Sequence, residues 1–299
     1  MFFLITGAWT DAKKHIHEIE AHGHHVLFMQ QEKDDLPCDP SVIEAVICNG
    51  LFLYHDINQF KRLRYIQLTS AGYDRVPMDI IKTRNIEIHN ARGVYSVPMA
   101  EHAIMGILEL LRKSFVYQNY QKNREWRKER NLIELNGKEV LIIGCGSVGT
   151  ECAKRLYAFG TRIKGINRSP KQSEYFDEIS SMDDLDAYIK TADIIILAIQ
   201  LSEETENLIN QDRLSMVKDT AILVNISRGR VIDEKALIKA LKDHKIRGAF
   251  LDVFEDEPLS TDSPLWDCEN AILTPHVSFI GDGNSGRLWQ VILENIKDV

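Results

Sequence analysis

Three residues with acid–base or anion-binding side chains follow predicted strands that are far apart in the chain: Arg228, Glu257 and His276. The carboxyl ends of strands in one parallel sheet converge on one crevice, so these side chains can meet there. A protonated His276 can give a proton to a developing alkoxide, and Glu257 would orient that ring and stabilise the imidazolium. The planar guanidinium of Arg228 can hold a carboxylate and polarise a carbonyl. Taken singly, each residue also fits a simpler role, as half of a structural ion pair or as a polar loop residue.

The glycine-rich segment Gly144–Gly149 is the second chemical feature, with the sequence Gly-Cys-Gly-Ser-Val-Gly. It follows the apolar run Val140–Ile143, which predicts a buried strand, and it opens a helix predicted over residues 148–159. In this context the first glycine allows a tight bend, the second lets the backbone approach a pyrophosphate, and the third lets helix and strand pack closely. The free N–H groups at the start of the helix then face the phosphates. A turn that binds nothing is the simpler alternative.

The residues after the next predicted strand, Arg162–Ile166, decide between the two nicotinamide dinucleotides. An Asp or Glu there would favour NAD by bonding the ribose hydroxyls, whereas this chain has Asn167-Arg168-Ser169. Asn167 removes a negative charge that would repel a 2′-phosphate, Arg168 offers a bidentate guanidinium, and Ser169 offers a hydroxyl donor. We therefore predict a preference for NADP, with NAD as the alternative. The competing interpretation makes Arg168 a solvated surface charge and leaves Asn167 to serve the ribose.

Strands that alternate with helices must position these residues. Apolar runs predict strands at residues 2–6, 26–29, 45–48, 65–68 and 86–89 in the first third of the chain. Later runs predict strands at residues 140–143, 162–166, 193–199, 221–225, 248–252 and 271–274. Such alternation is typical of parallel sheets with helices on both faces, so the second part of the chain is expected to form a sheet of six or seven strands.

Four helical segments complete this prediction. A buried helix is expected from Pro98, at its first helical position, to about Tyr117, and a polar helix over residues 11–21. A helical region is expected over residues 207–216, and an amphipathic helix over residues 287–299. Glu101 and His102 form a candidate catalytic pair within the first of these helices, but we favour polar groups that are satisfied inside the protein.

The composition limits the function classes. With 299 residues, of which 44% are hydrophobic and 27% charged, the chain is expected to fold into two globular domains. The net charge of −8 argues against a nucleic-acid binder and against attachment to an anionic membrane. The five cysteines are scattered without a C-x-x-C pair, which indicates reduced thiols in the cytoplasm. The run Phe2–Ile5 is too short to span a bilayer, and the histidines of His22–His25 lack a further ligand, so we expect no metal site.

Seven segments together resemble the D-isomer-specific 2-hydroxyacid dehydrogenase family over nearly the whole chain. They are Ser70–Asp74, Ala100–His102, Gly144–Gly149, Asn225–Gly229, Asp252–Pro258, Ser263–Trp266 and Thr274–His276. Their order and separations make the resemblance specific. It implies that Arg228, Glu257 and His276 are the catalytic set, and that a nicotinamide dinucleotide is the cofactor.

The resemblance also implies the binding residues. Backbone N–H groups of Ala71, Gly72 and Tyr73 would bind the substrate carboxylate together with Arg228, and Asp252 would contact the nicotinamide end of the cofactor. The expected cofactor contacts are Gly144, Gly146, Ser147, Val148, Gly149, Asn167, Arg168, Ser169, Ile199, Ile226, Ser227, Asp252 and His276.

The predicted architecture is α/β, with a Rossmann cofactor domain inserted in a flavodoxin-like substrate domain, both doubly wound parallel sheets. Residues 1–96 and 277–299 would form the substrate domain and residues 97–276 the cofactor domain, with a cleft between them. The expected reaction is NAD(P)-dependent reduction of a small 2-oxo acid to the D-2-hydroxy acid, and its reverse. The resemblance further implies a homodimer.

Two other functions stay open at this point. One is a nucleotide-sensing, corepressor-like binding protein, and the other is a phosphite or formate dehydrogenase. Departures from the family pattern at Gln200, where proline is usual, and at Phe279, where glycine is common, leave the shape of the substrate pocket open. Glyoxylate and hydroxypyruvate are the smallest candidate substrates, with phenylpyruvate-type and branched acids as larger ones.

Overall fold

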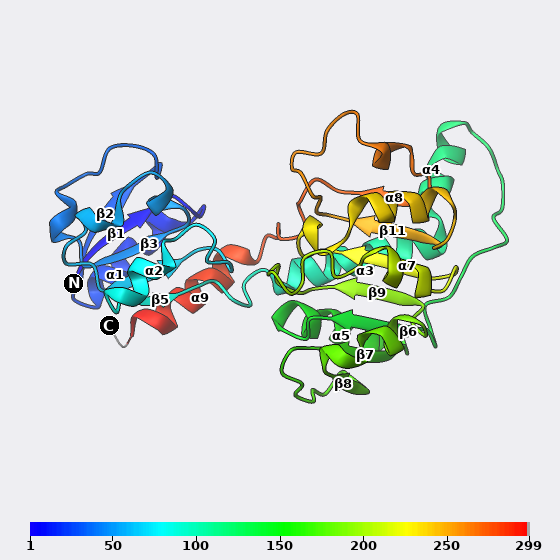
Figure 1. Ribbon diagram of the computed structural model, residues 1–299. Coiled ribbons are helices and arrows are strands. Elements are labelled where there is room, and N and C mark those ends of the chain that lie inside the picture. Colours follow the sequence, from blue (N-terminus) through cyan, green and yellow to red (C-terminus); the bar gives the residue numbers. More distant parts are fainter. Residues whose placement is uncertain (298–299) are drawn as a thin grey trace. The chain divides into compact units, whose positions relative to one another are not determined.

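The computed structural model describes residues 1–297 and divides into two compact units. Unit 1 consists of Met1–Tyr95 together with the chain from Gly281 onward, and unit 2 is Ser96–Ile280 (Figure 1). The predicted junctions lie one residue and four residues from these. Residues 277–280 fall in unit 2, where the N–H groups of Val277 and Ser278 donate to the buried carboxylate of Asp252 at 2.9 Å.

Unit 1 contains a five-stranded parallel sheet with the strand order β2-β1-β3-β4-β5. Its strands are β1 (Phe2–Thr6), β2 (His25–Met29), β3 (Ala45–Cys48), β4 (Tyr65–Leu68) and β5 (Glu87–His89). Its helices are α1 (Ile16–Ala21), α2 (Met78–Thr83) and α9 (Asn284–Ile296). This is the flavodoxin-like order, in which the chain reverses its direction of winding between β1 and β3.

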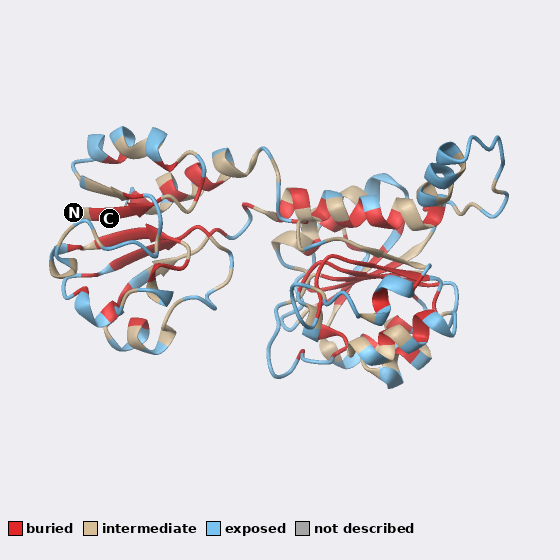
Figure 2. Ribbon diagram, turned by 90° about the horizontal axis from the view of Figure 1, so that it is seen from above, coloured by how far each residue is buried: buried red, intermediate tan, exposed pale blue. Residues whose placement is uncertain are grey.

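Both faces of this sheet are covered by apolar side chains. Successive strand residues point to opposite faces, so Phe3 and Ile5 belong to one core cluster and Leu4 to the other. The first cluster includes Trp289 and Ile292 of α9, although that helix lies at the other end of the sequence. The three central strands β1, β3 and β4 are accordingly buried in Figure 2, as continuous apolar runs predict, whereas the edge strands β2 and β5 are mostly half-buried.

Unit 2 contains a seven-stranded parallel sheet with the order β12-β11-β10-β9-β6-β7-β8. Its strands are β6 (Glu139–Ile143), β7 (Arg162–Ile166), β8 (Glu178–Ser180), β9 (Ile194–Leu197), β10 (Ile222–Asn225), β11 (Gly248–Leu251) and β12 (Ala271–Leu273). Its helices are α3 (Ser96–Arg112), α4 (Ser114–Lys122), α5 (Ser147–Ala158), α6 (Leu185–Ile189), α7 (Gln211–Met216) and α8 (Glu234–Lys242). One face packs on α3 and α5 and the other on α6, α7 and α8. The winding reverses between β6 and β9, and the predicted pair of doubly wound parallel sheets is confirmed.

The helix predicted from Pro98 to Tyr117 was wrong at both ends. Helix α3 begins at Ser96, so Pro98 is its third residue rather than its first. Helix α3 ends at Arg112, because Lys113 adopts a left-handed backbone with φ of +54° and a separate helix, α4, begins at Ser114. A left-handed residue ends the α-helical hydrogen-bond ladder and redirects the chain.

Smaller differences have similar local causes. The helix expected over residues 11–21 is a 3-10 turn at Ala12–His15 followed by α1. In the region expected to be helical over residues 207–216, Asn207 has a left-handed φ of +50° and only Gln211–Met216 is α-helical. The tail helix begins earlier than predicted, at Asn284, and its predicted last two residues lie outside the described part of the chain. Within residues 1–297, no helix is long and apolar enough to span a bilayer.

Candidate active site

The glycine-rich turn lies where the winding of the unit 2 sheet reverses, between the carboxyl ends of β6 and β9. Gly144 has φ of +100°, and a Cβ atom there would overlap the carbonyl of Ala198, so only glycine fits this bend. A Cβ atom at Gly149 would overlap the Gly144 carbonyl oxygen, whereas a Cβ atom at Gly146 would meet no atom within 4 Å. Helix α5 begins at Ser147, so its first N–H groups border this open space. These features fit a dinucleotide pyrophosphate.

The three residues after β7 are those predicted to meet the adenosine end of the cofactor. The side-chain amide of Asn167 donates to the Ser169 carbonyl at 3.1 Å and closes the turn. Arg168 and Ser169 are exposed, and the Arg168 side chain forms no hydrogen bond or ion pair with any of residues 1–297. The Arg168 guanidinium is therefore free to bind an anion.

Asn225, at the end of β10, shapes the loop that carries Arg228. Its Oδ1 atom accepts hydrogen bonds from the backbone N–H (3.0 Å) and hydroxyl (2.8 Å) of Ser227, and its Nδ2 atom donates to the Arg228 carbonyl at 3.0 Å. Arg228 is exposed, and its Nη1 atom donates to the Ser227 carbonyl at 2.8 Å. A Cβ atom at Gly229 would overlap the backbone of Phe254, so this loop packs directly on the segment that follows β11.

Glu257 and His276, which are 19 positions apart in the sequence, come together. The Oε2 atom of Glu257 lies 2.7 Å from Nδ1 of His276, and its Oε1 atom accepts the Phe254 N–H at 3.0 Å. Both side chains are about one-third exposed, at 33% for Glu257 and 39% for His276, so the pair is open to a ligand. Arg228 lies on the adjoining loop and has no hydrogen bond or ion pair to either residue within the described chain.

Asp252 lies beneath the His276 loop with its carboxylate 0% exposed. Its Oδ1 atom accepts from Thr274 Oγ1 at 2.7 Å and from the Val277 N–H, and its Oδ2 atom accepts from the Ser278 N–H, both at 2.9 Å. Burial raises the pKa of Asp252, but hydrogen bonds from His102, Ser278, Thr274 and Val277 outweigh it and hold the pKa well below its usual range. The hydrogen bonds of the Asp252 carboxylate are to other residues of unit 2. Its contact with the nicotinamide stays a prediction.

The structure separates Glu101 from His102. His102 is largely buried, and its Nε2 atom lies 3.0 Å from Thr274 Oγ1 and 3.5 Å from Asp252 Oδ1. Glu101 is exposed and pairs with Arg155 at 3.0 Å. His102, Thr274 and Asn225 thus support the candidate site, yet none was predicted to do so. Only Asn225 carried a local signal, because an Asn two residues before a Ser favours a turn closed by its side chain.

The predicted carboxylate-binding loop of unit 1 follows β4. Ala71 is held through its carbonyl by Asn90 Nδ2 at 2.7 Å, and the Ser70 hydroxyl donates to the Gly72 carbonyl at 3.1 Å. The N–H groups of Ala71, Gly72 and Tyr73 form no hydrogen bond within residues 1–297. Three consecutive free donors at the carboxyl end of a parallel strand suit an anion.

The sequence comparisons agree with this geometry. Residues 104–278 match the family model described as D-isomer specific 2-hydroxyacid dehydrogenase, NAD binding domain. The chain belongs to this family. The predicted resemblance is therefore confirmed, and the chain is an oxidoreductase of the D-isomer specific 2-hydroxyacid dehydrogenase family with a nicotinamide-cofactor domain in unit 2.

Individual family members extend the likeness beyond that domain. The chain is 36% identical to a glyoxylate reductase of Pyrococcus furiosus over 224 residues, which are 72% of this chain and 66% of that protein. It is 32% identical to a glyoxylate/hydroxypyruvate reductase of Arabidopsis thaliana over 269 residues, which are 87% of this chain and 81% of that one. The solved structure of an NADPH-dependent glyoxylate/hydroxypyruvate reductase of Sinorhizobium meliloti, in complex with citrate, is similar with a TM-score of 0.81 at 25% identity, covering 99% of this chain and 93% of that chain.

Proposed function

We propose that the chain reduces a small 2-oxo acid to the D-2-hydroxy acid, and catalyses the reverse reaction, with glyoxylate or hydroxypyruvate as the substrate. The observation that carries the proposal is the 2.7 Å contact between His276 Nδ1 and Glu257 Oε2 beside the Arg228 loop. The names of the Pyrococcus, Arabidopsis and Sinorhizobium relatives support the choice of substrate. The free N–H groups of residues 71–73 support recognition of a carboxylate.

A bound nicotinamide dinucleotide supplies the hydride for the carbonyl carbon and accepts it in the reverse direction. Gly144, Gly146, Ser147, Val148 and Gly149 would hold its pyrophosphate through the turn and the start of α5. Further contacts are proposed from the residues that follow β9, β10 and β11, which are Ile199, Ile226, Ser227 and Asp252.

The residues of the chain itself would handle the proton and the charges. Because Glu257 engages Nδ1 of His276, the Nε2–H of the imidazolium is left to protonate the carbonyl oxygen as it gains negative charge. Arg228 and the N–H groups of residues 71–73 would together bind the carboxylate of the substrate. Closure of the two domains over the substrate would exclude water from the reaction.

An initial-rate panel tests this function, with NADPH and NADH each measured against glyoxylate, hydroxypyruvate, pyruvate and phenylpyruvate. We expect cofactor oxidation with the two small acids. Cofactor binding without oxidation by any of the acids would contradict the proposal and favour a nucleotide-sensing protein. Turnover with phosphite or formate alone would favour the other alternative.

We also propose a preference for NADP over NAD. The guanidinium of Arg168 supports this preference, because it is exposed and has no partner among residues 1–297. Asn167 also supports it, because an acidic residue at that position would repel a 2′-phosphate. The matched family model is described as NAD-binding, so the preference rests on these residues of the chain. Five free thiols among the described residues support the expected cytoplasmic location.

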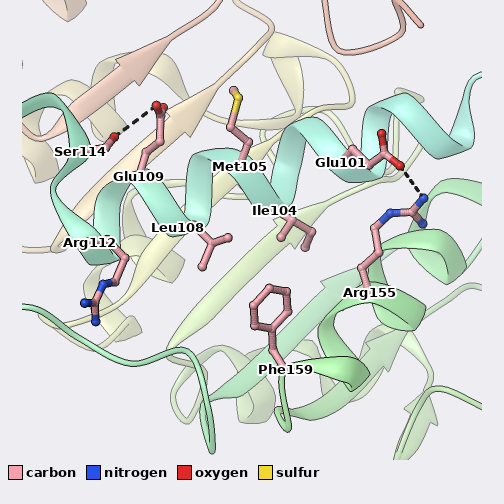
Figure 3. A pocket seen from close by; sticks show the side chains of 9 residues that line it. All are labelled: Glu101, Ile104, Met105, Leu108, Glu109, Arg112, Ser114, Arg155 and Phe159. Carbon is pink, nitrogen blue, oxygen red and sulfur yellow. Dashed lines mark hydrogen bonds and ion pairs between the residues drawn. The ribbon is translucent and has the colours of Figure 1, made fainter. Parts of the chain in front are cut away.

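A second copy of this chain is the proposed partner of unit 2. Helices α3 and α5 carry an open groove of about 650 Å³, in which Ile104, Leu108 and Phe159 point toward one another (Figure 3). The nearby helix α4 has no buried residue, and Trp126 beyond it is 97% exposed. Exposed apolar surface of this kind marks an interface, and a two-fold dimer is the commonest way to cover it.

Light scattering after size-exclusion chromatography tests the dimer. We expect the wild type to have twice the mass of the chain, and Trp126→Ala combined with Met105→Glu to shift it toward the monomer. Trp266→Ala is the matched control, since Trp266 is exposed but does not line the groove. A monomeric wild type would contradict the proposal.

A further inference from the structure

The side-chain carboxylate of Glu32 lies at the carboxyl ends of β1 and β3 and is held there by hydrogen bonds. The Oε1 atom of Glu32 accepts hydrogen bonds from Thr6 Oγ1 at 2.8 Å and from the Asn49 N–H at 2.6 Å. Its Oε2 atom accepts from the Gly50 N–H at 2.7 Å, and its backbone carbonyl lies 2.8 Å from Nε2 of His55. Glu32 therefore joins the end of β1, the loop after β2 and the loop after β3.

This position is the point at which the winding of the unit 1 sheet reverses, since β1 lies between β2 and β3. Open α/β sheets bind their ligands at such points, outside the carboxyl ends of the strands. Consecutive N–H groups that converge on one point form an anion-binding nest, and Asn49 and Gly50 provide two of them. In this chain the anion in the nest is the carboxylate of Glu32.

The nest adjoins the predicted carboxylate-binding loop of residues 71–73. Cys48 pairs with Leu68 in the register of β3 and β4, and the Thr69 N–H donates to the Cys48 carbonyl at 2.9 Å. The residues that follow the two strands thus leave the sheet side by side, about 5 Å apart, as neighbouring strands do. A substrate held by the free N–H groups of residues 71–73 would lie next to the Glu32 nest.

Glu32 also fixes the backbone of that neighbouring loop. Gly50 is buried, and the side-chain Oδ1 atom of Asn49 is buried without a hydrogen-bond partner among residues 1–297. The Asn49 side-chain oxygen therefore does not anchor this loop. Its anchors are the two main-chain bonds to the Glu32 carboxylate, which are charge-assisted and short.

We propose that Glu32 is a specificity-determining residue, which restricts the substrate to 2-oxo acids with a single carboxylate. The proposal rests on the proposed 2-oxo acid reductase function. A second carboxylate on the substrate would meet a nest that is already filled and a fixed negative charge, and like charges in a partly desolvated site repel one another. A small 2-oxo acid with one carboxylate presents no second charge there, and it would meet the backbone of Asn49 and Gly50 beside the side chains of Leu53 and Arg75.

Kinetics of Glu32→Ala test the specificity, with glyoxylate and the dicarboxylate oxaloacetate as substrates. We expect the ratio of kcat/KM for oxaloacetate to kcat/KM for glyoxylate to rise by about tenfold, mainly through KM, because the repelling charge is gone and the nest is open. Asp35→Ala is the matched control, since it removes an exposed carboxylate from the same loop. A ratio in Glu32→Ala equal to that in Asp35→Ala overturns the proposal.

Acetate binding gives a readout that is independent of turnover. Thermal melting of Glu32→Ala is compared in sodium acetate and in sodium chloride at equal ionic strength. We expect acetate to raise its melting temperature by at least about 2 °C more than it raises that of the wild type or of Asp35→Ala, because acetate refills the nest. An equal effect of acetate on all three proteins would show that removal of the Glu32 carboxylate leaves no anion-binding nest, and would overturn the proposal.

The two measurements separate the inference from the function on which it rests. If the wild type reduces no 2-oxo acid while acetate selectively stabilises Glu32→Ala, the proposed function and the specificity role both fail and the nest alone stands. If Glu32→Ala does not fold, Glu32→Gln keeps the side-chain shape without the charge. It is expected to show a smaller rise in the oxaloacetate ratio, and no rise in that variant overturns the proposal.

Discussion

The two oxygens of Glu257 hold two different parts of the chain: Oε2 lies 2.7 Å from Nδ1 of His276, while Oε1 accepts the N–H of Phe254 at 3.0 Å. The backbone of Phe254 is also the surface against which Gly229 packs. One carboxylate therefore connects the orientation of the imidazole to the loop that carries Arg228. This link explains how three residues that are distant in sequence keep one arrangement.

Replacing His276 by Ala should abolish most turnover while NADPH still binds. Loss of a general acid costs about 10²- to 10⁴-fold in kcat. Stopped-flow measurement of kcat and fluorescence titration of NADPH check this. His17→Ala is the control because His17 is exposed in unit 1. Turnover of His276→Ala at the wild-type rate would rule out the proton-donor role.

The double variant Asn167→Asp, Arg168→Ala should shift cofactor preference toward NADH. It would remove the proposed charge-assisted pair with a 2′-phosphate, and such a pair is worth about 1.5–3 kcal/mol, or about 10- to 150-fold in the ratio of kcat/KM values. The ratio is measured with both cofactors at a fixed glyoxylate concentration. An unchanged NADPH/NADH ratio would show that the loop after β7 does not read the phosphate.

Two glycines of the same turn should respond differently to alanine. Gly146→Ala adds a methyl group to open space at an ordinary backbone conformation, so stability should stay within about 0.5 kcal/mol while NADPH affinity falls. Gly149→Ala would overlap the Gly144 carbonyl oxygen and should destabilise the fold by about 1–3 kcal/mol. Urea unfolding and NADPH titration of both variants make the comparison. Unchanged NADPH affinity in Gly146→Ala would argue against a pyrophosphate there.

The same substitution should have opposite signs in two helices. A Cβ atom at Gly106 in α3 would overlap the Phe250 ring, so Gly106→Ala should lower the free energy of unfolding by about 1–3 kcal/mol. A Cβ atom at Gly286 in α9 meets nothing within 4 Å, so Gly286→Ala should raise it by about 0.5–1 kcal/mol. Both values come from urea unfolding. Equal effects at the two positions would contradict the packing described for α3.

Asp252 should make stability depend on pH in the acid range. Its pKa in the folded protein lies below the ordinary value of 3.8, so its ionised form stabilises the fold fully above that value, and this contribution is lost as the pH falls below it. Asp252→Asn should cost about 3 kcal/mol at pH 7, because buried donors lose their charged acceptor. The difference from the wild type should shrink as the pH is lowered from 5 to 3 in urea titrations. A difference that is constant over this range would refute the assignment.

The strands could be predicted because each is a short apolar run. Val140–Ile143 and Arg162–Ile166 match the observed β6 and β7 to within one residue. Strand β8 was missed because Glu178-Ile179-Ser180 contains a single buried apolar residue. The break at Lys113 was missed because hydrophobic periodicity continues across it, and a left-handed backbone at a lysine leaves no mark in the sequence.

The candidate site could be predicted only in its residue types. Acidic, basic and imidazole side chains at strand ends indicated Arg228, Glu257 and His276, and the family resemblance supplied their roles. The support from His102 depends on a contact with Thr274 across 172 residues, which no local pattern encodes. The bonds of Glu32 to the loop after β3 are hidden in the same way.

Unit 1 is built from two stretches of chain with the whole of unit 2 between them. Four buried residues of its core come from α9, which are Leu288, Trp289, Ile292 and Ile296. During synthesis on the ribosome, unit 2 is therefore complete in sequence before unit 1, although unit 1 emerges first. Until α9 has been made, the face of the unit 1 sheet that carries Phe3 and Ile5 lacks these four side chains, so unit 2 can finish folding before the core of unit 1 is complete.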